Sequence, residues 1–354
     1  MKKNKIFSVF KYLFFLSCGI GLLWYVTQKQ DINKLILEFK TANYFWIVLA
    51  MSMGGLSHVA RAARWNMIIE SMGHKTKLSH TFYAVMIGYF ANMLVPRLGE
   101  VSRCGVLSKN GKIPFTTLLG TVVAERIFDA FCLLFLTFLV VIFQFRFLKE
   151  FLSTYIFEPL SLNLFSNYTV LLLVLILIIV FIVGLYIVYK MTNKRLKKKP
   201  TYLKFRRVMS GFSEGIKAIA HIQNKGAFLL HTLFIWFMYF LMTYLCFFSL
   251  EGTSHLTTAD GLTILIMGSI GIVAPVPGGI GAYHFIVILT LTELYGINAT
   301  SATSFAYISH ASQGALITLL GIISFAFFFL LNKKAKRAAE QEMHNQAVNN
   351  NNHQ

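Results

Sequence analysis

The sequence predicts an all-α, polytopic membrane protein with about six full spans and two re-entrant half-helix hairpins in an inverted repeat. Of the 354 residues, 56% are hydrophobic and only 13% are charged, a composition foreign to soluble domains. Several apolar runs exceed the roughly 18 residues that mark a transmembrane helix. Two shorter apolar segments, one in each half of the chain, are interrupted by glycine and proline, which is typical of the central helices of transporters.

The long apolar segments and the charges between them predict the topology. The Lys and Arg residues, which give a net charge of +19, crowd the loops between the spans. This distribution follows the positive-inside rule and suits contact with anionic lipid headgroups rather than with nucleic acid. We therefore expect both termini in the cytoplasm and full spans at 6–25, 44–63, 115–145, 168–189, 228–250 and 304–331.

The first interrupted segment reads GYFANMLVPRLGEVSR and ends at Arg103. The apolar stretch before its proline has only about 14 residues, too few to cross a bilayer core. Pro96 removes a helical hydrogen bond from the next turn, and Arg97 and Glu100 follow it. Interrupted backbone survives at membrane depth only where protein or water covers it. We therefore expect a half-helix that carries charge into a cavity.

The second interrupted segment reads GSIGIVAPVPGGIGAYH and contains the same Val-Pro step. After Pro277, the glycines Gly278, Gly279 and Gly281 let the backbone approach a ligand closely. The first segment lies between basic loops and the second between weakly charged ones, so we expect the two hairpins to insert from opposite sides, as an inverted repeat requires. The alternatives are two ordinary proline kinks in continuous helices, or eight full spans.

Two further helices carry charged residues within apolar sequence. Arg61 and Arg64 are three residues apart and share a helical face, and so do Glu125 and Asp129, which are four apart with Arg126 beside them. Ionised side chains in a membrane helix are costly and are expected to pair or to face a cavity. The alternative is that the third span begins only at residue 126, which would leave the preceding carboxylate at the interface.

Four motifs occur in a fixed order: RAARW at 61–65, NMLVPRLGEVSR at 92–103, ERIFD at 125–129 and APVPGGIGAYH at 274–284. This ordered set resembles the transmembrane region of lysylphosphatidylglycerol synthases and the stand-alone flippase-like proteins related to it, over roughly 11–331. The resemblance implies a membrane protein that moves a lipid between leaflets. The synthases carry a soluble aminoacyl-transferase domain after the membrane region.

The resemblance also sets the expected domain organisation. This chain ends about 20 residues beyond its last span, so the synthase activity is expected to be absent. We expect a flippase-like transmembrane domain at 1–332 and a disordered cytoplasmic tail at 333–354, whose composition is rich in Asn, Gln and Glu.

The expected function is translocation of a phospholipid or lipid-linked headgroup across the cytoplasmic (inner) membrane, with membrane lipids as partners and a homo-oligomer compatible with the sequence. Guanidinium groups suit phosphate, and the carboxylates can orient the arginines or meet a cation. We predict no catalytic residue, metal site or cofactor, and we expect His58, His284 and His310 to be isolated, packed or interfacial residues rather than catalysts. The predicted substrate-binding residues are Arg61, Arg64, Asn92, Pro96, Arg97, Glu100, Arg103, Glu125, Arg126, Asp129, Pro277, Gly278, Gly279 and Gly281.

Two other functions remain open at this level. Paired carboxylates and arginines also suit an intramembrane transferase that acts on a lipid carrier. Alternatively, the charges only pair helices, and the protein is a non-transporting structural partner in the membrane.

Overall fold

The computed structural model describes residues 2–28, 30–111, 113–143 and 221–351. Within these ranges the chain is built of helices and contains no β-strand, which confirms the predicted all-α class. The span predicted at 168–189 and most of the basic loop before the next span lie outside the described residues.

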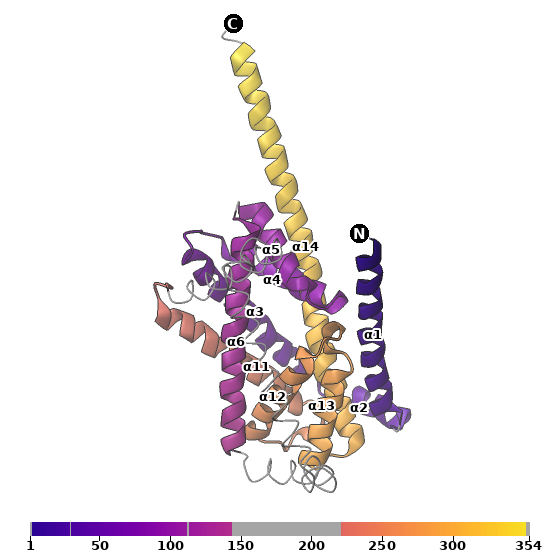
Figure 1. Ribbon diagram of the computed structural model, residues 1–354. Coiled ribbons are helices and arrows are strands. Elements are labelled where there is room, and N and C mark those ends of the chain that lie inside the picture. Colours follow the sequence, from indigo (N-terminus) through magenta and orange to yellow (C-terminus); the bar gives the residue numbers. More distant parts are fainter. Residues whose placement is uncertain (1, 29, 112, 144–220, 352–354) are drawn as a thin grey trace, which may run out of the picture.

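The N-terminal part forms a long helix followed by a short one. Helix α1 is Lys2–Thr27 and α2 is Ile32–Thr41. Asp31 caps α2, because its carboxylate accepts hydrogen bonds from the backbone N–H groups of Asn33 and Lys34, at 2.9 and 3.4 Å. Helix α2 buries Leu35, while Ile36 on the same short helix is exposed. Figure 1 shows α2 at the end of the molecule opposite the start of α1.

In the described part of the chain, four long helices form the body of the bundle: α3 (Tyr44–Glu70), α6 (Phe115–Phe143), α11 (Lys225–Phe247) and α14 (Ala299–Asn351). Among the described helices, α11 and the Ala299–Leu330 part of α14 are long and apolar enough to cross a membrane. Helices α3 and α6 have 27 and 29 residues but carry charged side chains within them. Helix α14 continues as helix through most of 333–354, where the sequence predicts disorder.

The first interrupted segment forms a helical hairpin, α4 (Leu78–Leu94) followed by α5 (Leu98–Gly111). The interruption lies at the predicted Val-Pro step. Helix α5 folds back onto α4 so closely that a Cβ on Gly99 would collide with the carbonyl oxygen of Gly88. Both positions therefore need glycine, because any side chain would push the two helices apart.

The second interrupted segment forms a second hairpin from α12 (Thr258–Val273) and α13 (Ala282–Leu289), which continues into the π-helical turn η4 (Thr290–Leu294). A capping box between Thr257 and Asp260 begins α12. Between the arms, the short 3-10 turn η3 (Pro277–Gly279) contains Gly278 and Gly279, and Gly281 follows it. All three glycines have positive φ, at 59°, 76° and 83°.

Glycine also allows the two arms of the second hairpin, α12 and α13, to pack closely against each other. A Cβ on Gly271 would lie 2.7 Å from the Cα of Tyr283, so α12 and α13 cross with their backbones almost in contact. The spacing from the close-packed glycine to its partner across the break is similar in the two hairpins, Gly88 to Gly99 and Gly271 to Tyr283. The two halves thus repeat one local design.

The two hairpins lie toward opposite ends of the molecule and meet at their tips. Figure 1 shows α4 and α5 in the upper half and α12 and α13 in the lower half. At the meeting point, a Cβ on Gly278 would lie 3.9 Å from the Cα of Met93. The start of α1 and the end of α14 lie on the same side. Each hairpin has its own apolar core, one around Trp65 and Leu118 and the other around Phe247 and Phe305.

Candidate functional site

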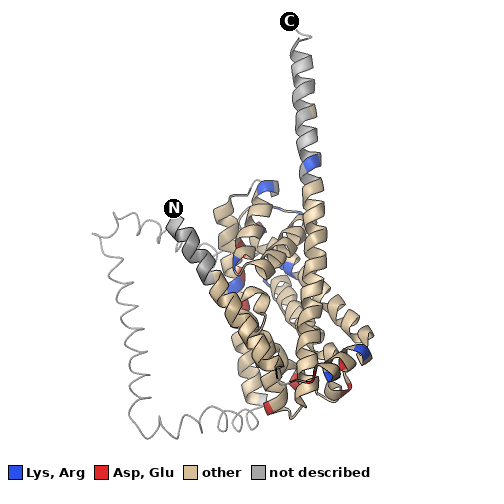
Figure 2. Ribbon diagram, turned by 90° about the vertical axis from the view of Figure 1, so that its right-hand side faces the viewer, with Lys and Arg blue, Asp and Glu red and all other residues tan. Residues whose placement is uncertain are grey.

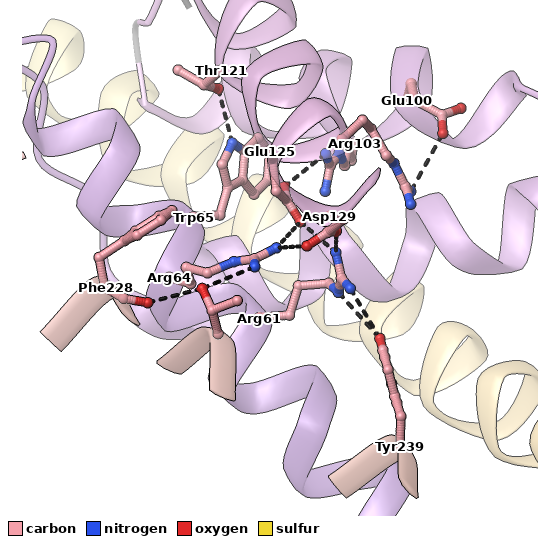
Figure 3. Close-up of polar contacts among 12 residues, drawn as sticks. Arg61, Arg64, Trp65, Glu100, Arg103, Thr121, Glu125, Asp129, Phe228 and Tyr239 are labelled. Atoms are coloured by element: carbon pink, nitrogen blue, oxygen red, sulfur yellow. Dashed lines mark hydrogen bonds and ion pairs between the residues drawn. The ribbon is translucent and has the colours of Figure 1, made fainter. Parts of the chain in front are cut away.

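Two arginines of α3 face two carboxylates of α6 in the interior. Arg61 Nη1 lies 2.6 Å from Glu125 Oε1 and 2.7 Å from Asp129 Oδ2. Arg64 Nη2 lies 2.7 Å from Asp129 Oδ1 and 3.4 Å from Glu125 Oε1. Figure 3 shows the four side chains pointing toward one another. The predicted spacings, i,i+3 for the arginines and i,i+4 for the carboxylates, therefore place two charges on one face of each helix, and these two faces meet.

The first hairpin adds a third arginine. Arg103 of α5 donates from Nη2 to Glu125 Oε2 at 2.9 Å, and its guanidinium lies 4.6 Å from the ring centroid of Trp65. The indole Nε1 of Trp65 in turn donates to Thr121 Oγ1 at 2.8 Å. The close crossing of α4 and α5 holds Arg103 in this place, since a Cβ on Gly88 would lie 3.1 Å from the Arg103 Cβ.

Helix α11 supplies neutral hydroxyl groups to the same site. Tyr239 accepts hydrogen bonds from Arg61 Nε at 3.3 Å and from Nη2 at 3.1 Å. Thr232 accepts from Arg64 Nη1 at 3.2 Å. The sequence analysis missed both residues, because a single hydroxyl in an apolar helix leaves no pattern in the sequence. We call Arg61, Arg64, Arg103, Glu125 and Asp129 the arginine–carboxylate cluster.

The arginine–carboxylate cluster has an excess of positive charge. Its three arginines and two carboxylates sum to one net positive charge, with Glu125 fully buried and Arg103 only 2% exposed. Arg103 Nε and Nη1 and Arg64 Nε have no hydrogen-bond partner among the described residues. Buried donors and buried unpaired charge are costly. The cluster is therefore suited to an additional anion.

A second ion pair lies beside the arginine–carboxylate cluster and is more accessible. Arg126 Nη2 is 3.4 Å from Glu100 Oε1, and the two side chains are 41% and 27% exposed. Arg126 and Glu125 are sequence neighbours, so this pair sits next to the fully buried carboxylate. Figure 2 shows charged positions between the two ends of the bundle as well as at the ends.

The predicted residues at the tip of the first hairpin have different surroundings. Asn92 Oδ1 accepts a hydrogen bond from the Gly99 N–H at 2.7 Å, which ties the two arms together across Pro96. Arg97 is exposed, has φ 65°, and forms no ion pair within the described part of the chain. The structure thus gives Asn92 a role in shaping the break, and the predicted binding roles of these residues stay predictions.

The second break has its own polar group, built from histidines. The imidazole Nε2 of His310 donates to the Gly278 carbonyl oxygen at 2.8 Å. The rings of His284 and His310 lie 4.7 Å apart between centroids, so the expectation that these histidines are isolated is wrong. His58 packs on Tyr89 at 5.1 Å. The hydrogen bonds and ion pairs of the described residues do not join the second-break residues, Pro277 to Gly281, to the arginine–carboxylate cluster.

Comparison with known proteins supports the resemblance that the motifs suggest. The family model described as the lysylphosphatidylglycerol synthase TM region matches residues 8–321. The chain belongs to this family. A UPF0104 membrane protein of Methanocaldococcus jannaschii is 25% identical over 338 residues, which cover 91% of this chain and 94% of the relative. No solved structure matches the chain. The protein is therefore a membrane protein of this family, and the name of its relative states no substrate.

Proposed function

We propose that the protein translocates a lipid with a phosphate-bearing headgroup between the leaflets of the cell membrane. One observation carries the proposal: a buried cluster with excess positive charge, whose Arg103 guanidinium has two nitrogens without a hydrogen-bond partner among the described residues. A guanidinium binds phosphate through two parallel N–H donors, and such charge-assisted pairs are strong where water is scarce. The family match supports a membrane setting for this site.

The proposed topology places the hairpins as re-entrant elements that insert from opposite sides. Support comes from the loop between α3 and α4, which carries Lys75 and Lys77, and from the loop before α12, which has no Lys or Arg. These loops lie at opposite ends of the bundle in Figure 1. With the basic loop inside, the start of α1 and the end of α14 are cytoplasmic as well.

A headgroup needs a polar route through roughly 30 Å of hydrocarbon, while its acyl chains stay in lipid. In the proposed mechanism the phosphate binds the Nε and Nη1 atoms of Arg103, the side of the guanidinium that faces away from Glu125. Glu125 holds the guanidinium in place before and after the lipid passes. The outer face of α6 is apolar and exposed, with Phe131, Leu134 and Phe138 at 60% or more, which suits contact with lipid chains. Because Arg103 is paired with Glu125 when no lipid is bound and with phosphate while a lipid passes, its positive charge is paired at every stage.

The test is a lipid translocation assay with purified protein in liposomes. Labelled phosphatidylglycerol, phosphatidylcholine and a phosphate-free glycosyl diacylglycerol would be compared, and we expect protein-dependent movement of the phosphate-bearing lipids only. Arg103→Gln should slow it at least tenfold, because the amide removes the charge and the two-donor edge. Lys109→Gln is the matched control, since Lys109 is an exposed cation on the same helix, α5.

Each outcome has a clear meaning. If Arg103→Gln is monodisperse and moves lipid at the wild-type rate, the cluster is not the headgroup site. If neither protein moves lipid but the purified wild type transfers a group to or from a polyprenyl carrier, the transferase function replaces translocation. If all variants lose folded protein in parallel with activity, the charges serve helix pairing alone.

A further inference from the structure

The second break contains a histidine whose hydrogen bonding fixes its protonation state. Backbone N–H of Gly281 donates to His284 Nδ1 at 3.4 Å. Because Nδ1 accepts this bond, it carries no proton, and the ring is the neutral Nε2–H tautomer. His284 is only 4% exposed. It sits in the first turn of α13 and accepts the N–H of the N-cap residue Gly281, one of the N–H groups for which the start of a helix has no intrahelical partner.

We propose that His284 is a proton-binding site, and that protonation of Nδ1 opens the second break. A second proton on the ring would remove the lone pair that receives the Gly281 N–H and would set two donors against each other. The positive ring would also lie at the N-terminal end of α13, where the helix dipole disfavours a cation. The closed break thus excludes the proton, and only an opened break admits it.

The neighbours of His284 strengthen this exclusion. From α14, His310 lies 4.7 Å and Tyr307 4.8 Å from the His284 ring centroid, and Tyr283 of α13 lies 5.9 Å away. The other elements that pack against α13 also carry titratable residues, among them Cys18 and Tyr25 on α1, Asp260 in the first turn of α12 and Glu293 on η4. Asp260 is bonded to Thr257 at the start of α12, and Glu293 is bonded to Thr292 beside it. His310 does not depend on protonation to hold Gly278, since its donor Nε2–H is present in both forms.

Opening of this break would separate backbones that are now in close contact. A Cβ on Gly281 would collide with the carbonyl of Gly19 on α1, and one on Gly19 would lie 2.8 Å from the Ile280 carbonyl oxygen. Val276, beside the same contact, is 7% exposed. Release of the Gly281 N–H therefore loosens the tip of the second hairpin from α1 and from Met93 of the first hairpin. Protonation would in this way couple pH to the point where the two hairpins meet.

The test measures access to Val276 directly and does not measure lipid movement, so this inference and the proposed translocation can fail separately. A Val276→Cys variant is made in a chain whose native cysteines are replaced by alanine, and is placed in lipid nanodiscs. Its rate of labelling by a water-soluble maleimide is divided by that of Ser254→Cys, an exposed position, to remove the pH dependence of the thiol itself. Between pH 7.5 and 5.5 we expect this ratio to rise about tenfold, since imidazole protonates in this range.

Three variants separate the capping bond from the charge. His284→Asn places an amide oxygen where Nδ1 lies, so it keeps the acceptor without binding a proton, and the ratio should stay low at both pH values. His284→Ala removes the acceptor and should give a high ratio at both. His310→Gln keeps a donor toward Gly278 and should respond to pH as the wild type does. A flat wild-type ratio, a response retained in His284→Asn, or one lost only in His310→Gln would overturn the proposal.

Discussion

At the scale of single residues, Glu125 is the centre of the buried charge. Its two oxygens contact Arg61, Arg64 and Arg103, which come from α3 and α5, while Asp129 reaches only the two arginines of α3. Removing one partner of a buried ionic group leaves uncompensated charge, which costs far more than an exposed ion pair contributes. Glu125 should therefore matter more for stability than any other carboxylate among the described residues.

Glu125→Gln is expected to destabilise the protein by about 3–5 kcal/mol, because Arg103 would lose its carboxylate while Arg61 and Arg64 would share Asp129 alone. Glu100→Gln is the matched control, since its pair with Arg126 is partly exposed at 3.4 Å and should contribute no more than about 1 kcal/mol. The measurement is the fraction of monodisperse protein after heating in detergent. Equal heat resistance of Glu125→Gln and the wild type would contradict the burial of this charge.

At the scale of elements, each hairpin depends on glycine at the crossing of its arms and on a tie across its tip. In the first hairpin the tie is the bond from the Gly99 N–H to Asn92, and in the second it is the His310 bond to Gly278. A non-glycine residue, Arg97, adopts positive φ in the first tip. Such a conformation costs on the order of 1 kcal/mol and persists only where its surroundings enforce it.

Gly99→Ala is expected to destabilise the protein by about 1–3 kcal/mol, because its methyl group would collide with the Gly88 carbonyl and with Asn92. Gly105→Ala on the same helix is the control. Nothing lies within 4 Å of its added Cβ, so the better helix propensity of alanine should stabilise α5 by up to about 1 kcal/mol. Opposite shifts of the melting temperature are expected, and a harmless Gly99→Ala would refute the close crossing.

At the scale of the whole molecule, the hairpins repeat one design with opposite directions. They approach from opposite ends, meet where Met93 lies beside Gly278, and leave the start of α1 and the end of α14 on one side. Two hydrogen bonds tie the start of the chain to its second half: Ser301 donates to Glu38 of α2 at 2.6 Å, and the N–H of Asn43, just before α3, donates to the Ser249 carbonyl at 2.8 Å. The proposed inverted topology makes the two ends of the bundle face different compartments.

Cysteine labelling of intact cells tests that topology. In a chain without native cysteines, Ser254→Cys should react with a membrane-impermeant thiol reagent, while Lys75→Cys should react only after the membrane is opened. Both side chains are exposed, so burial cannot explain a difference. If both positions react from the same side, the hairpins do not insert from opposite sides and the inverted repeat is wrong.

Much of the local architecture follows from the sequence. Helix α4 ends before Pro96, and α12 ends before Pro275 and Pro277, because proline lacks the N–H that continues a helix. The spacings of Arg61 with Arg64 and of Glu125 with Asp129 placed each pair on one face, as the helical period requires. Composition alone predicted the membrane class that the family match supports.

What the sequence determined by itself was therefore the list of charged residues, the helices that carry them and the places where two helices stop. Only the tertiary structure decided which charges meet. Arg103 reaches Glu125 because α5 folds back over Gly88, Tyr239 and Thr232 join from a distant helix, and His284 of α13 contacts His310 of α14. These partners are separated along the chain, and a local pattern encodes only neighbours within a few turns, whereas helix crossings depend on side-chain fit over the whole bundle.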